Sequence, residues 1–131
     1  KSLLGEHDFS AFRAAGCQAK TPIKTMYQAD ISQQGPWFIF TFRANAFLHH
    51  MVRNMVGALV YVGAGRHQIA DFHEIFTSRN RQNSAPTFAA DGLYLSAIEY
   101  DTSFGLPADR LRLPFFIPNF PSACSHLKAK T

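Results

Sequence analysis

The sequence contains few of the residues that disulfide frameworks and metal centres require. Its 131 residues include two cysteines, Cys17 and Cys124, whose spacing matches no metal or redox motif, so a reduced chain is expected. On a helix, adjacent His49 and His50 would point about 100° apart and could not hold one ion together. His73 is followed by a glutamate but does not belong to an H-E-x-x-H motif. We therefore expect no metal site.

The sequence also lacks a membrane span and an evident nucleophile. No apolar run reaches the roughly 18–20 residues free of charge that a membrane span needs. No serine occurs in a G-x-S-x-G motif, and neither cysteine stands beside a basic residue that could activate it. Asp8, Asp71 and Asp91 are interpreted as helix caps or turn residues, so no catalytic carboxylate is expected. The first residues, KSLLGEHD, include no initiating Met and no signal-peptide pattern, and we expect the chain to be part of a longer protein.

Acidic residues are scarce in the first half of the chain. Residues 1–66 hold seven Lys or Arg and three Asp or Glu, whereas residues 67–131 hold six of each. The net charge of +4 therefore resides entirely in the first half. This distribution is typical of a surface that approaches a polyanion such as RNA, although many plain cytosolic domains are equally basic.

Hydrophobic periodicity and turn residues predict an α+β domain. The expected elements, in order, are a helix over 9–15 capped by Asp8 and a hairpin of strands over 23–32 and 37–43 that turns at Gly35-Pro36. A long helix over 45–63 follows, capped by Asn45 and ended by Gly63, and then a shorter helix over 71–79 with a capping box of Asp71 and Glu74, and a strand over 93–100. With one strand added, this order gives the split β-α-β-β-α-β arrangement of ferredoxin-like sheets, mostly antiparallel with the helices on one face. The added strand lies either upstream of Lys1 or near residues 111–117. Residues 119–131 are expected to form a flexible tail.

The long predicted helix carries an arginine in an otherwise apolar segment, NAFLHHMVRNMVGALVYVG. At the helical period, His50, Arg53, Asn54, Gly57 and Tyr61 fall on one narrow stripe. A buried guanidinium without a partner is costly, so either Arg53 extends to water or an anionic group comes to it. Gly57 removes a side chain from the stripe, which would allow another group to approach the helix closely.

Four sequence blocks carry a resemblance to a known family. GEHDFSAFRA, ANAFLHHMVRNMVG, APTFAADGLYLSAIEY and FGLP together resemble the C-terminal half of the tRNA pseudouridine synthase A family, over residues 5 to about 107. The resemblance implies that residues 1–118 are the C-terminal half of the catalytic domain, with an RRM-like variant of the ferredoxin fold. It also implies isomerisation of uridine to pseudouridine in the tRNA anticodon stem-loop, without a cofactor or metal.

The resemblance assigns roles to two residues. Arg53 matches the family arginine that pairs with the catalytic aspartate, and Leu93 matches a leucine that packs on the flipped base. The aspartate belongs to an R-T-D-A-G-V-H motif of the N-terminal half, which is absent from this sequence, as is the family's active-site tyrosine. We therefore predict that the chain is inactive without an N-terminal half. By residue type alone, Leu93 would be an ordinary core residue of a strand.

Further residues are candidates for lining the cleft or contacting RNA, although exposed surface charge is the default interpretation for each cation. They are Asn45, His49, His50, Asn54, Arg13, Lys20, Lys24, Arg43, Arg66, Arg79 and Arg81. The resemblance implies a homodimer with tRNA touching both subunits, and the cysteine usage favours a cytoplasmic location. The alternative is a non-catalytic RNA-binding module that stacks bases on Phe38, Phe40 and Phe42 of the second strand. That alternative requires these rings to be exposed rather than packed under the long helix.

Overall fold

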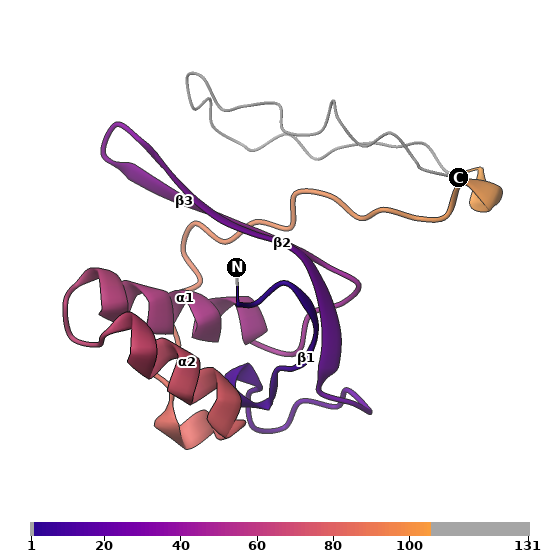
Figure 1. The fold of residues 1–131 in the computed structure, drawn as a ribbon. Helices are drawn as coiled ribbons and strands as arrows, with labels where there is room; N and C mark the ends of the chain where they lie inside the picture. The colour runs from indigo at the N-terminus through magenta and orange to yellow at the C-terminus, as the bar shows by residue number, and fades with distance from the viewer. Residues whose placement is uncertain (1, 106–131) are drawn as a thin grey trace. The chain divides into compact units, whose positions relative to one another are not determined.

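The computed structural model describes residues 2–105, which divide into two units at Asp91. Each unit is described by itself. The first unit contains a three-stranded antiparallel sheet in the order β1-β2-β3, with helices packed against it, and the α+β prediction is confirmed (Figure 1). The elements are β1 (Gly5–Asp8), η1 (Ser10–Phe12), β2 (Ile23–Gln34), β3 (Trp37–Ala44), α1 (Met51–Gly63), α2 (Ile69–Ser78), η2 (Arg81–Asn83) and, in the second unit, η3 (Thr102–Phe104). The predictions for residues 111–117 and 119–131 lie outside the described residues.

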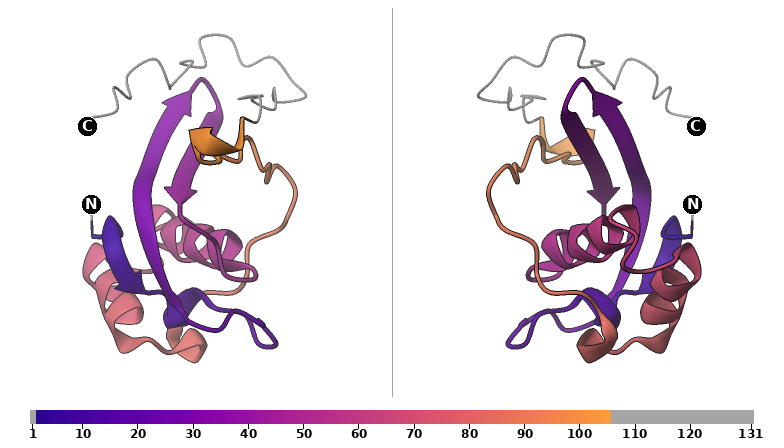
Figure 2. Two further views of the ribbon diagram at one scale, coloured as in Figure 1. Left: turned by 90° about the vertical axis from the view of Figure 1, so that its right-hand side faces the viewer. Right: turned by 90° about the vertical axis from the view of Figure 1, so that its left-hand side faces the viewer.

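The predicted hairpin is present, and β2 is longer than expected. Gln34 pairs with Trp37 across a tight turn in which Gly35 has a φ of 56°, a conformation that favours glycine. The register shifts between Met26 and Gln28, which marks a β-bulge. Because of this shift, both Met26 and Ala29 contribute to the core on the helix-covered face. Figure 2 shows the hairpin as a long curved ribbon that extends beyond the helices.

The first strand was not predicted. Gly5–Asp8 pairs antiparallel with the start of β2, whereas the sequence pattern predicted Asp8 as the cap of a helix over 9–15. The Asp8 carboxylate does accept a hydrogen bond from the Ser10 backbone at 2.9 Å, but only one 3₁₀ turn follows. One turn is enough to bury Phe9 and Phe12 completely, so burial and strand pairing prevail over local helix propensity.

Both α-helices begin at other residues than predicted. Asn45 does not cap α1, because its side-chain oxygen accepts a hydrogen bond from the Thr25 backbone at 3.0 Å. The helix instead follows His50, which has a left-handed φ of 58° and makes no side-chain cap. In α2 the capping box joins Gln68 and Asp71, one turn earlier than the predicted pair of Asp71 and Glu74. Neither helix is long and apolar enough to span a membrane within residues 2–105.

The predicted strand over 93–100 is not formed in the structure, and this prediction is wrong for the described residues. The turn at Asp91 and Gly92 is present, with a φ of 80° at Gly92. The apolar residues that follow are exposed. They are Leu93, Tyr94, Leu95, Ile98 and Tyr100. Alternating apolar residues favour a strand only where a neighbouring strand accepts the backbone hydrogen bonds, and residues 93–100 have no strand partner here.

A glycine allows the segment of residues 85–88 to lie directly on α1. A Cβ atom added at Gly57 would come within 2.4 Å of the Pro86 carbonyl oxygen, which is backbone and cannot swing away. This segment therefore contacts the polar stripe predicted on the long helix at Arg53, Asn54 and Gly57. The close approach that Gly57 was expected to permit is made by the chain's own backbone.

We predict that Gly57→Ala destabilises the chain by about 1–3 kcal/mol, because the helix and the 85–88 segment must separate to admit the methyl group. Urea unfolding followed by far-UV circular dichroism measures the effect. Gly63→Ala is the matched control, since a Cβ at Gly63 meets nothing within 4 Å. Equal stabilities of the two variants would contradict the close contact between α1 and residues 85–88.

Candidate active-site arginine and its surroundings

Within the part of the chain that the structure describes, Arg53 is hydrogen-bonded through one side-chain nitrogen, and its other two side-chain nitrogens have no partner. Its Nε donates a hydrogen bond to the Phe88 carbonyl oxygen at 2.7 Å, and the Phe88 backbone N–H donates to the Arg53 carbonyl at 3.2 Å. Among residues 2–105, neither Nη1 nor Nη2 has a hydrogen-bond partner or an ion pair. The side chain is partly exposed. A guanidinium fixed in this way presents two parallel N–H donors, the geometry that binds a carboxylate in a bidentate manner.

His49 and His50 lie beside each other just before α1. Their ring centroids are 3.9 Å apart and their planes differ by 32°, because these residues precede the helix instead of belonging to it. The angular argument from helical spacing was therefore wrong for this pair. The described residues nevertheless contain no group of three or more side chains that could hold a metal ion.

The loop before α1 is anchored to the loop after η1. The His49 backbone N–H donates to the Cys17 sulfur at 3.4 Å, and the Ala14 N–H donates to the His49 carbonyl at 3.2 Å. His50 itself adopts left-handed backbone geometry, which costs free energy in a residue other than glycine. Such geometry is maintained only where surrounding contacts enforce it, so the backbone at His49 and His50 is fixed by the fold.

The residues predicted to contact RNA differ in how far their N–H donors are already bonded within the protein. Arg81 donates to four protein acceptors, and Arg13 donates to the carbonyls of Cys17 and Ala19 at 2.7 and 2.9 Å. Arg79, by contrast, is 69% exposed and lies only loosely beside Asp8, at 3.7 Å. Lys20 is also exposed.

The remaining candidates have local contacts. Lys24 donates to the backbone carbonyls of Thr21 and Ile23, both at 2.9 Å, and the Arg66 guanidinium lies 5.1 Å from the centre of the Tyr61 ring. Arg43 lies over the ring of Tyr27 at 5.3 Å. The contacts of Lys24 and Arg66 leave N–H donors available for phosphate.

Leu93 belongs to the second unit, where its side chain is 48% exposed. Its role against a flipped base remains a prediction, as does its relation to Arg53. The exposed state differs from the buried position expected of an ordinary strand residue.

The helix-facing rings of β3 change in exposure along the strand. Phe42 packs against the core, Phe40 is half-buried and Phe38 is 63% exposed near the end of the hairpin. Stacking on all three rings is therefore not available in this unit. On β3, Phe38 and the neighbouring Trp37, which is 67% exposed, are the most accessible aromatic rings, and as adjacent strand residues they point to opposite faces of the sheet.

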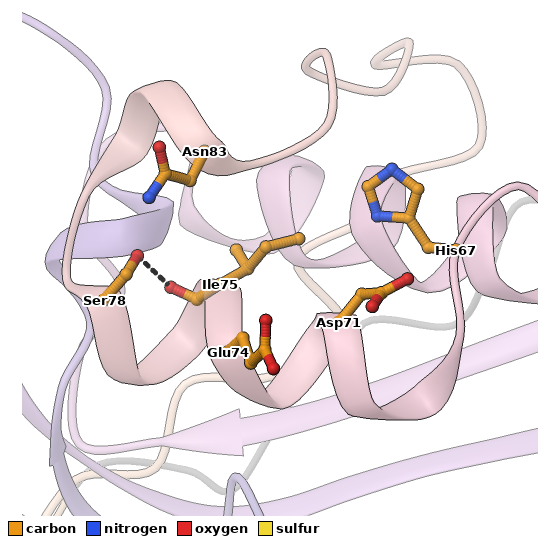
Figure 3. A pocket seen from close by; sticks show the side chains of 6 residues that line it. All are labelled: His67, Asp71, Glu74, Ile75, Ser78 and Asn83. Carbon is orange, nitrogen blue, oxygen red and sulfur yellow. Dashed lines mark hydrogen bonds between the residues drawn. The ribbon is translucent and has the colours of Figure 1, made fainter.

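A cavity of about 420 Å³ lies along α2, and none of the predicted site residues lines it (Figure 3). Its lining comprises His67, Asp71, Glu74, Ile75, Ser78 and Asn83. Asp71 already serves the capping box, and the two carboxylates disfavour a phosphate ligand. This cavity is not a candidate RNA site.

The most informative contacts of Arg53 were not predicted from the sequence. Its partner, the Phe88 carbonyl, is 35 residues away in the chain, and a backbone acceptor carries no signature in the residue type. The only available signal was Gly57 on the polar stripe, which indicated a close approach without identifying what approaches.

Comparison with known proteins agrees with the resemblance carried by the four blocks. The family model described as tRNA pseudouridine synthase matches residues 1–101. The chain is 58% identical over 106 residues to tRNA pseudouridine synthase A of Paraburkholderia phytofirmans, covering 81% of this chain and 39% of that protein. It is 56% identical to the proteins of the same name from Bordetella petrii, with 80% and 39% covered, and Aromatoleum aromaticum, with 83% and 41% covered.

The chain therefore belongs to the tRNA pseudouridine synthase family. It spans about two fifths of the length of the curated relatives it matches.

The pKa of His50 is predicted to lie below the ordinary histidine value, because desolvation disfavours the charged ring and because His49 and Arg53 add positive charge nearby. The folded state then binds this proton more weakly than the unfolded state, so His50 reduces stability as the pH falls below about 6.5. An NMR titration of the ring measures the pKa. Arg53→Met should raise it, whereas Arg79→Gln should leave it unchanged; no change in either variant would contradict the charge coupling.

Proposed function

We propose that this chain supplies the arginine side of the active site of a tRNA pseudouridine synthase, and that the catalytic aspartate comes from an N-terminal half. The observation that carries the proposal is the state of Arg53. Its Nε is fixed to a backbone carbonyl while Nη1 and Nη2 have no partner among residues 2–105. Family membership supports the reaction class, and the free bidentate donors support pairing with a carboxylate.

In this proposal the arginine keeps the aspartate ionised and oriented toward the sugar of the target uridine. The carboxylate then either attacks the ribose C1′ or removes a proton from the sugar, and the N-glycosidic bond breaks. The uracil rotates and bonds through C5. The target uridine must leave its stack to reach the carboxylate, and Leu93 is proposed to pack against the displaced base. The anticodon stem-loop is the proposed location of that uridine.

The role of Arg53 is tested in the complete enzyme. Arg53→Ala should lower kcat by about 10²- to 10³-fold, the usual cost of removing one preorganised charged donor from an active site. Arg53→Lys should recover little, because an ammonium cannot bond to Phe88 and also present two parallel donors. Release of tritium from tRNA labelled at uracil C5 measures turnover.

Lys20→Gln is the matched control for Arg53, since it removes one exposed positive charge and leaves α1 untouched. It should alter KM for tRNA in a salt-dependent way and leave kcat unchanged. Full turnover by Arg53→Ala would show that the arginine has another role.

We also predict that the 131 residues alone form no pseudouridine, because they lack the proposed aspartate. Addition of an N-terminal half that contains the R-T-D-A-G motif should restore turnover on anticodon-arm uridines. The same mixture with that aspartate changed to asparagine is the control. Turnover by the chain alone would identify a carboxylate of this sequence as the catalytic group.

The alternative function, a non-catalytic RNA-binding module, is favoured by one observation: Trp37 and Phe38 are exposed at the end of the hairpin. In that case the chain binds tRNA through stacking, and no N-terminal half produces turnover. The mixing experiment therefore separates the two functions. Homodimer formation and a cytoplasmic location are further parts of the main proposal, and light scattering of the isolated chain tests whether this half dimerises.

A further inference from the structure

Arg81 connects four protein acceptors and leaves little capacity for RNA. From η2, its Nη1 donates to the carbonyls of Ser84 and Ala85 at 3.3 and 3.0 Å. Its Nη2 donates to Asn54 Oδ1 and to the Thr87 hydroxyl, both at 3.1 Å. Two of these acceptors, on Ala85 and Thr87, belong to the segment that lies on α1, and Ser84 directly precedes that segment. The fourth acceptor is a side chain of α1 itself. The guanidinium therefore fastens residues 84–87 to the helix.

Asn54 is the buried centre of this network. It is 0% exposed, and its Nδ2 donates to the Phe12 carbonyl at 2.7 Å. Its Oδ1 accepts from Arg81 and from the Thr87 hydroxyl, the latter at 2.7 Å. Thr87 has a single hydroxyl proton and gives it to Asn54, so toward Arg81 it acts as acceptor. Each member thus has a defined donor or acceptor role, and loss of one leaves a buried polar group unsatisfied.

The network ends one residue before the acceptor that fixes Arg53. Thr87 is followed by Phe88, whose carbonyl accepts the Arg53 Nε–H and whose N–H donates to the Arg53 carbonyl. On the other side, Pro86 rests against Gly57. A displacement of residues 85–88 therefore moves the Phe88 oxygen and with it the direction of the guanidinium.

We propose that Arg81 and Thr87, acting through Asn54 and Phe88, are positioning residues for Arg53. The inference rests on the proposed function, in which Arg53 pairs with a catalytic carboxylate. It reassigns Arg81 from a surface cation that binds phosphate to a structural connection within the active-site half. A misplacement of about 1 Å in a catalytic group can cost on the order of 10²-fold in rate, so this connection controls turnover without touching the substrate.

The hydroxyl of Thr87 gives the sharpest test, because Thr87→Val replaces it with a methyl group and Thr87→Ser retains it. In the complete enzyme, Thr87→Val should lower kcat by about 10- to 100-fold with KM for tRNA unchanged, and Thr87→Ser should keep most of the activity. Arg81→Lys is the second variant. It preserves the charge, so a phosphate-binding role predicts little change in kcat, whereas a positioning role predicts a loss similar to that of Thr87→Val.

A second readout needs no activity. In the 131-residue chain, NMR should detect the Arg53 Nε–H as slowly exchanging, and both Thr87→Val and Arg81→Lys should accelerate its exchange by about tenfold or more. Circular dichroism reports whether each variant is folded, and only folded variants are compared. Wild-type kcat and wild-type exchange in both variants would overturn the positioning role. If Arg53→Ala retains turnover, the proposed function fails instead, and the exchange data still decide whether Arg81 and Thr87 fix Arg53.

Discussion

The docking of residues 85–88 on α1 is the constraint on which the arginine site depends. Gly57 supplies the space, because any side chain there would collide with the Pro86 carbonyl. The backbone of Phe88 then pairs with both the backbone and the side chain of Arg53. Without this contact, Arg53 would be a long flexible side chain whose ordering costs free energy on each encounter with a carboxylate. With this contact in place, Arg53 is already partly ordered in the folded chain, so binding a carboxylate costs less conformational free energy.

The sequence predicted the elements whose signal is local. The hairpin of β2 and β3 was predicted from alternation and a Gly-Pro turn, and the end of α1 from Gly63. The start of α1 could not be predicted in the same way, because Asn45 has the composition of a cap but bonds to Thr25 across the sheet. Likewise, β1 forms because it pairs with β2, and its four residues show no periodicity from which a strand could be predicted.

In the candidate site, too, the features with a local sequence signal could be predicted and those that depend on distant contacts could not. Arg53 was recognisable because a cation on an apolar helix requires an explanation, and Gly57 because it interrupted a stripe of side chains. Neither residue type reveals the hydrogen-bond partner of Arg53, because the side chain is fixed by a backbone atom. Arg81 illustrates the converse: its type suggests a surface cation, but its position after α2 directs it to protein carbonyls. Residue type therefore identifies candidates, and long-range geometry decides their roles.

Electrostatics explains why the open donors of Arg53 favour an acidic partner. The first turn of α1 contains no Asp or Glu, so the positive end of the helix dipole is not compensated within that turn. His49 and His50 lie at the same end, and the depressed pKa of His50 reflects desolvation and the surrounding positive charge. A carboxylate bound by Nη1 and Nη2 would offset the positive charge at this end of the helix, and that charge would in turn keep the carboxylate ionised. The positive charges of His49 and Arg53, which add to the effect of desolvation on the pKa of His50, thus also favour a negative charge beside Arg53.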